Sequence, residues 1–290
     1  MESRDPHAQA PVVAAFKPET GAFEPVEFGV AASRVTGAPL IVAVVTAGVP
    51  VVHQLADDVD PGVEHLRARL RERRVYRPDI REYSDSSAPR GLMKAIEHLQ
   101  PELVVVGATG RSGVRAALLG STAGRVVHSS PCPVAVVPRG YRRPEQGVQV
   151  VGAAFAPDED GREALKFAAR LARAGRVRLR AITVVSPEES TQHPREQLQA
   201  AVDECAKDLE VDIDVVVNDA PQGLVAASST LDMLVVGSRA LAPRRAAMAG
   251  SVSRHVVEHA DCPVLVLPRG TDERREALVG DAELHASKTS

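Results

Sequence analysis

The sequence predicts an α/β protein made of two tandem, doubly wound, open parallel sheets, and three observations support this fold class. Strand-like apolar runs alternate with helix-like segments along the chain, the order expected of βαβ units around a parallel sheet. Some runs, such as LIVAVV at 40–45, are continuously apolar, as strands covered on both faces usually are. Residues 103–140 return at 233–270 without a gap, with 17 identities in 38 positions. The chain therefore contains two copies of one unit.

Apolar periodicity and turn residues predict the elements of the first unit in order. Gly37 is suited to end the first helix, and Leu66 and Leu70 lie four residues apart in a strongly charged, solvent-facing helix. Leu92 and Ile96 share one side of the next helix, and Pro138 stops the last strand. Strands are predicted at 11–16, 40–45, 77–83 (weak, at a sheet edge), 103–106 and 134–137, and helices at 26–35, 65–74, 88–99 and 120–129.

The second unit repeats this order, and the linker and the tails differ from the units in composition. Strands are predicted at 150–155, 179–185, 213–217, 233–236 and 264–267, and helices at 162–174, 196–209, 224–230 and 251–259. The predicted organisation is a tail at 1–10, a first domain at 11–140, a polar linker at 141–147, a second domain at 148–270 and a charged tail at 271–290. We expect that last tail to be disordered.

Composition excludes several classes of function. A net charge of -3 provides no electrostatic footprint for nucleic acid, and no apolar run approaches the length of a membrane span. The first residues lack the layout of a secretory signal, and the three cysteines show no CxxC or metal spacing. We therefore expect a cytoplasmic protein that binds neither nucleic acid nor membrane and holds no metal cofactor.

A glycine-bearing loop follows the fourth predicted strand of the first unit. Gly107 and Gly110 are separated by two residues, and Gly120, Ser121 and Thr122 follow at the start of a helix. Ligands of open α/β sheets bind outside the carboxyl ends of the strands, and a helix N-terminus suits phosphate. A structural interpretation stays open, since a serine here is also a good N-cap. No GxGxxG or GxxxxGK[ST] motif supports a dinucleotide fold or a P-loop hydrolase.

The spacing G-x2-G-x9-G-[ST], followed by Cys-Pro-Val and a terminal strand, resembles the universal stress protein family in its tandem two-domain form. The resemblance extends from about residue 11 to residue 269. It implies five parallel strands per unit in the order 3-2-1-4-5, with helices on both faces, and ATP bound through the loop. By position, it assigns phosphate and ribose contacts to Gly107, Gly110, Gly120, Ser121 and Thr122, and adenine contacts to Val44 and Val45.

The chain departs from the family pattern in both units. The acidic residue that family members carry after strand one is replaced by Lys17 in the first unit and by Ala156 in the second. Lys17 either reaches a phosphate or is simply solvated, and the sequence favours the solvated state. In the second unit Ala240 replaces the second glycine, Pro243 stiffens the loop, and three acidic residues at 158–160 disfavour a polyphosphate. The first unit is thus the expected nucleotide site, and the second is expected to be degenerate.

Other candidate residues have structural explanations. Cys132 and Cys262 occupy equivalent positions before proline, which favours a packing role over a redox pair. His255 and His259 lie four apart, a spacing that can bind metal, but no suitable third ligand accompanies them and a surface helix is favoured. The predicted fold places no Ser-His-Asp set together, and no general base or metal-binding carboxylate is evident at the glycine-bearing loop.

The resemblance and the intact first loop predict a regulatory stress-response protein that binds ATP in domain 1 and is not an enzyme, although slow ATP hydrolysis stays open. The alternative is a nucleotide-independent interaction or oligomerisation protein of the same fold. The terminal strands Val134–Val137 and Val264 to Leu267 are expected to mediate self-association of domains or chains, as a homodimer or a compact pseudo-dimer.

Overall fold

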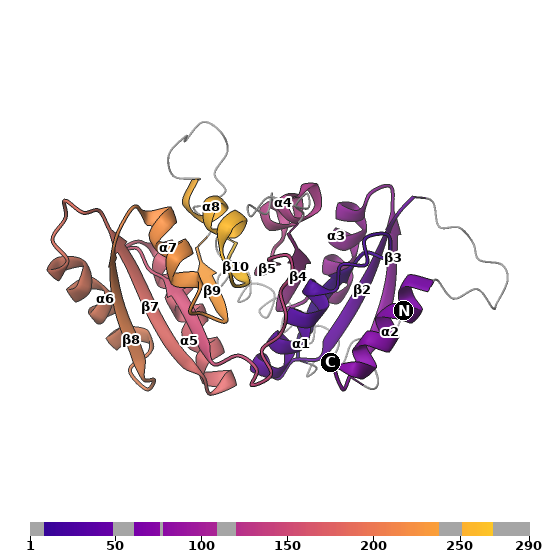
Figure 1. Ribbon diagram of the computed structural model, residues 1–290, viewed down its shortest axis with the longest axis horizontal. Coiled ribbons are helices and arrows are strands. Elements are labelled where there is room, and N and C mark those ends of the chain that lie inside the picture. The colour runs from indigo at the N-terminus through magenta and orange to yellow at the C-terminus, as the bar shows by residue number, and fades with distance from the viewer. Residues whose placement is uncertain (1–8, 49–60, 76–77, 109–119, 238–250, 269–290) are drawn as a thin grey trace, which may run out of the picture.

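The structure is a computed structural model, and it describes residues 9–48, 61–75, 78–108, 120–237 and 251–268. Strands and helices alternate in both units, as the sequence predicts (Figure 1). In chain order the first unit contains β1 Val12–Phe16, α1 Glu24–Thr36, β2 Leu40–Ala47, α2 Pro61–Glu72, β3 Asp79–Asp85, α3 Ala88–Leu99, β4 Leu103–Gly107, α4 Ser121–Ser129 and β5 Val134–Val137. The second contains β6 Val150–Ala154, α5 Glu159–Gly175, β7 Arg178–Val185, α6 Gln192–Cys205, β8 Val211–Val217, α7 Ala220–Ser228, β9 Met233–Val236, α8 Ser251–His259 and β10 Val264–Val266.

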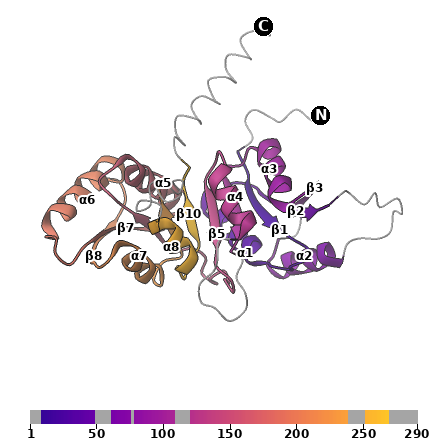
Figure 2. The same cartoon turned by 90° about the horizontal axis from the view of Figure 1, so that it is seen from above.

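The two units form one continuous sheet of ten strands in the order β3-β2-β1-β4-β5-β10-β9-β6-β7-β8. Each unit contributes five parallel strands in the order 3-2-1-4-5, and the weak third strand lies at the edge, as expected. The units join where β5 pairs with β10 in antiparallel register, with Ala135 opposite Leu265. Figure 2 shows these two strands side by side at the centre of the molecule. The two open sheets are therefore joined edge to edge within one chain.

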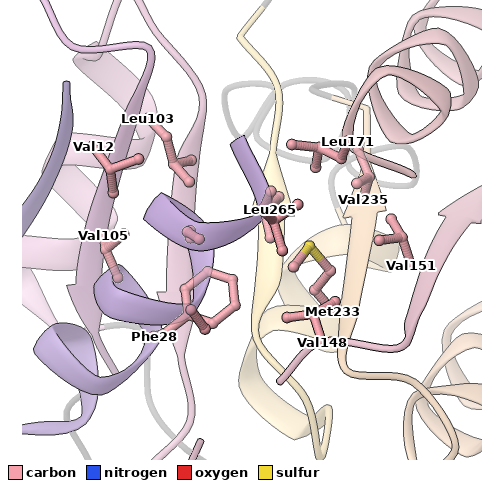
Figure 3. Packing of buried hydrophobic residues seen from close by; sticks show 14 of the residues in the cluster. Val12, Phe28, Leu103, Val105, Val148, Val151, Leu171, Met233, Val235 and Leu265 are labelled. Carbon is pink, nitrogen blue, oxygen red and sulfur yellow. The ribbon is translucent and has the colours of Figure 1, made fainter. Parts of the chain in front are cut away.

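Helices cover both faces of the sheet because successive strand residues point to opposite sides. Leu103 and Val105 of β4 belong to the buried cluster that includes residues of α1, α2, α5 and α6. Val104 and Val106 belong to the cluster on the other face, which includes residues of α3, α4, α7 and α8. Both clusters of buried residues contain side chains of β5 and β10 and so cross the seam between these strands. Figure 3 shows part of the cluster that contains Leu103 and Val105. Few aromatic residues take part, as composition suggests, and the core consists mostly of Val, Leu, Ile and Ala. None of the described helices is both long and apolar enough to cross a membrane.

One helix lies four residues earlier than the sequence predicts. The prediction placed a helix at 196–209, but α6 spans Gln192–Cys205 and a turn follows it. Pro194 is compatible with the first turn of α6. Backbone N–H groups in the first turn have no acceptor within the helix, so the absence of an N–H in proline breaks no helical hydrogen bond. Leu209 contributes apolar contacts from the turn, where its N–H donates to the Ala206 carbonyl. The helix therefore ends before Leu209, which the prediction had placed inside it.

Strand register identifies equivalent residues of the two units. Val12 pairs with Leu103 on β4, and Val151 pairs with Met233 on β9. Because Leu103 and Met233 are equivalent in the repeat, Lys17 is equivalent to Ala156. The connection from strand to helix contains seven residues, 17–23, in unit one and four residues, 155–158, in unit two. The longer connection of unit one forms part of the pocket described next.

Candidate functional site

A pocket of about 800 Å³ lies in unit one at the carboxyl ends of β1, β2, β4 and β5. This is the position at which open parallel sheets bind ligands. Its walls come from the 17–23 connection, the starts of α1, α3 and α4, the far end of α2, and the first residues of the linker. Elements far apart in sequence thus enclose one site.

The structure brings together four of the residues predicted from the sequence. Gly107, Thr122, Val45 and Lys17 all line the pocket. Val44 does not, because its side chain points to the opposite face of the sheet and is buried among residues packed with α1 and α2. Of the adenine contacts predicted at the end of β2, only the Val45 side chain is placed in the lining.

The start of α4 differs in detail from the prediction. Gly120, with φ -62° and ψ 161°, is the N-cap, and Ser121 is the first helical residue. Ser121 is therefore not the N-cap. Thr122 is half-buried in the lining of the pocket. Gly110, predicted to contact phosphate, lies outside the described residues, as do Ala240 and Pro243 of unit two.

Gly107 has a packing role that is independent of any ligand. A Cβ atom at this position would lie 3.1 Å from Pro25 Cγ at the start of α1. At the equivalent Gly237, it would lie 2.7 Å from the Asp160 carbonyl oxygen at the start of α5. Since both units need this close approach of helix to strand, the shared glycine by itself does not identify a binding site.

The charge of the lining favours an anionic ligand. Five basic side chains, Lys17, Arg69, Arg73, Arg139 and Arg142, face only two acidic ones, Glu24 and Glu27, an excess of three positive charges. Both acids are engaged. Glu24 Oε1 accepts a hydrogen bond from the Gly140 N–H at 3.0 Å, and Glu27 Oε1 lies 2.6 Å from Arg73 Nη2. A phosphate group would be attracted to this pocket.

Glu27 is a pocket residue that the sequence analysis missed. It belongs to the first turn of α1, and its partner Arg73 follows α2, 46 residues later. The Glu27 side chain is 3% exposed and that of Arg73 is 39% exposed, so the carboxylate is the buried member of the pair. In a helical pattern Glu27 appears as an ordinary first-turn acid. Nothing in the local sequence reveals its burial.

The linker completes the wall of the pocket. Tyr141 packs edge-on against Phe28 of α1, with ring centroids 5.8 Å apart. Burial raises the pKa of the Tyr141 hydroxyl, and the negative charges of Asp232 and Glu27 raise it further, so the hydroxyl stays protonated. A residue predicted to belong to a simple connection thus becomes part of the site.

The corresponding region of unit two is organised differently. Asp158 caps α5, and its Oδ1 accepts a hydrogen bond from the Gly161 N–H at 2.8 Å. Gly161 packs so closely on the preceding turn that a Cβ atom would lie 2.2 Å from the Ala156 carbonyl oxygen. The carboxylate of Asp158 therefore accepts a hydrogen bond from a backbone N–H at the start of the helix that it caps.

The remaining candidates show structural contacts. His255 and His259 stack with ring centroids 4.1 Å apart, and His259 Nδ1 lies 2.8 Å from the His255 carbonyl oxygen. No group of three metal-binding side chains occurs within the described part of the chain. Burial raises the pKa of the Cys132 thiol to about 11, and Cys262 is also buried. Thiols that are protonated at neutral pH are poor nucleophiles.

Fold and pocket together define a tandem α/β protein with a ligand-sized pocket in its first unit. The model of the universal stress protein family matches residues 11–138 and 148–268. The chain belongs to the universal stress protein family.

Similar proteins support this assignment. A Mycobacterium tuberculosis H37Rv protein named Universal stress protein Rv2319c is 30% identical over 203 residues, covering 63% of this chain and 69% of that protein. A crystal structure of a universal stress protein from Archaeoglobus fulgidus DSM 4304 superimposes with a TM-score of 0.63 and 17% identity, over 90% of this chain and 99% of that one. The crystal structure of the functionally unknown protein PA1789 of Pseudomonas aeruginosa PAO1 superimposes with a TM-score of 0.66 and 16% identity, over 94% of this chain and 98% of that one. The two structures show that the fold is shared.

Proposed function

We propose that the protein is a regulatory, non-enzymatic, cytoplasmic member of its family that binds an adenine nucleotide, ATP, in unit one. The observation that supports this most directly is the positively charged pocket at the carboxyl ends of the unit-one strands, with Gly107, Thr122, Val45 and Lys17 in its lining. A volume of about 800 Å³ is within the range of small-molecule sites. Unit two is proposed to be degenerate.

In this proposal the residues of unit one hold different parts of the nucleotide. Backbone N–H groups at Gly120, Ser121 and Thr122 and the positive end of the α4 dipole would hold phosphate. The half-buried Lys17, for which the sequence favoured a solvated side chain, lines the pocket and would add a positive charge. Val45 would supply an apolar contact to the base.

We expect saturable ATP binding that Gly110→Trp abolishes, because the indole would occupy the space in which the loop backbone approaches the phosphates. The measurement is isothermal titration calorimetry with ATP on the full chain. Ala240→Trp is the matched control, since it makes the same change at the equivalent position of unit two and should leave the affinity within about twofold. Absence of binding at millimolar ATP to the folded wild type would refute the proposal, as would equal losses in both variants.

We also propose that the two units act as a pseudo-dimer within one chain. The antiparallel pairing of β5 with β10 supports this, because each of the terminal strands then has a neighbour on both edges. Sedimentation equilibrium should accordingly give a mass near that of one chain, 30.8 kDa. A stable mass of two chains would instead favour the alternative of an oligomerisation protein.

A further inference from the structure

The unit-one pocket extends around the carboxyl ends of the strands to both faces of the sheet. Val45, Leu92 and Ala123 line it from the face covered by α3 and α4, here called the α3–α4 side. Phe23 lines it from the other face, the α1–α2 side, where it is buried among residues of α1 and α2. The volume of about 800 Å³ lies near the upper end of the range for small-molecule sites. One ligand can therefore contact both faces.

Basic side chains are concentrated on the α1–α2 side of the pocket. Arg69 belongs to α2, and Arg73 follows the last residue of that helix. Arg139 and Arg142 come from the segment after β5, which a hydrogen bond joins to the start of α1. Against these four positive charges stand the two carboxylates of the pocket, so this side has an excess of two. In the described part of the lining, the α3–α4 side contributes no charged side chain.

Arg69 is held in an orientation that suits anion binding. Its guanidinium carbon lies over the Phe23 ring, 4.1 Å from the ring centroid. Stacking engages the flat face of the guanidinium and leaves the N–H groups in its plane for other partners. Phe23 belongs to the connection between β1 and α1, which contains seven residues against four in unit two. The longer connection of unit one therefore fixes a guanidinium in the wall of the pocket.

We propose that the α1–α2 side of the pocket, with Arg69 in its wall, is a second phosphate subsite, and that unit one prefers an adenine nucleotide with a separate phosphate group on its ribose. This inference rests on the proposed function, in which the base contacts Val45 and the phosphate chain approaches Thr122. Both residues lie on the α3–α4 side. A group that reaches the α1–α2 side must therefore branch from the ribose between them. Guanidinium groups recognise phosphate through charge-assisted, bidentate hydrogen bonds.

The test compares ADP with its isomers adenosine 3′,5′-bisphosphate and adenosine 2′,5′-bisphosphate, by isothermal titration calorimetry on the full chain at constant ionic strength. We expect one bisphosphate to bind at least about tenfold more tightly than ADP, because only its second phosphate reaches Arg69. Arg69→Met should remove most of this preference and leave the affinity for ADP within about twofold. Arg67→Met is the matched control and should leave the preference unchanged, since Arg67 lies on the same helix, pairs with Glu64 and is not part of the pocket lining.

Equal affinities of ADP and both bisphosphates would overturn this inference and leave the proposed function in place. Equal losses of the preference in Arg69→Met and Arg67→Met would also overturn it, because they would attribute the preference to net charge. Failure of all three nucleotides to bind the folded wild type would refute the proposed function and the inference together. Circular dichroism melts establish that each variant is folded. The bisphosphate that binds more tightly identifies the ribose oxygen that carries the second phosphate.

Discussion

Replacing Arg73 with Met is expected to lower the free energy of unfolding by about 3–5 kcal/mol, because it leaves the buried Glu27 carboxylate without its positive partner. Glu27 is 3% exposed and lies 2.6 Å from Arg73 Nη2. Nothing else in the described part of the chain donates to its second oxygen. Urea denaturation at neutral pH, followed by circular dichroism, measures the shift in midpoint.

Two further variants distinguish the cost of an unpaired buried carboxylate from the cost of losing an ion pair. Glu27→Met should change stability by only about 1 kcal/mol, since Arg73 is 39% exposed and water can solvate it. Arg173→Met removes a similar arginine from a pair in which Asp208 is 55% exposed, and should destabilise the protein far less than Arg73→Met. Comparable losses in all three variants would contradict this explanation.

Leu265→Ala is expected to cost about 2–5 kcal/mol and to weaken the coupling between the two units. Leu265 is fully buried at the centre of β10, opposite Ala135 of β5. Figure 3 shows it between Phe28 of unit one and Met233 of unit two. Removing its side chain leaves a cavity at the seam, where apolar contacts from both units meet.

Differential scanning calorimetry measures this effect through the melting temperature and the cooperativity of unfolding. Val217→Ala is the control, because Val217 is 51% exposed on the edge strand β8 and its truncation should change stability by less than about 0.5 kcal/mol. We expect Leu265→Ala to broaden or split the transition as well as lower it. If Leu265→Ala lowers the melting temperature no more than Val217→Ala does, the apolar contacts at the seam contribute little to the stability of the protein.

The degree to which the site was predictable varies from residue to residue. Gly107 and Thr122 were predicted from loop spacing and line the pocket. The side chain of Val44, which was also predicted, lies on the opposite face of the sheet, because side chains alternate along β2 and Val45 faces the pocket. Glu27 and Tyr141 were missed because their environment is created by α2 and the linker folding onto α1.

The sequence by itself determined the repeat, the βαβ order and the inequality of the two units, since these depend on local periodicity and on comparison of equivalent positions. It placed Leu66 and Leu70 four residues apart in a charged helix, and the structure shows both of them buried. Only the tertiary structure decided that β5 pairs with β10 in one continuous sheet, and that Arg73 and the linker enclose Glu27. Backbone pairing at a strand edge and burial of a charge both depend on segments distant in sequence, which local patterns do not encode.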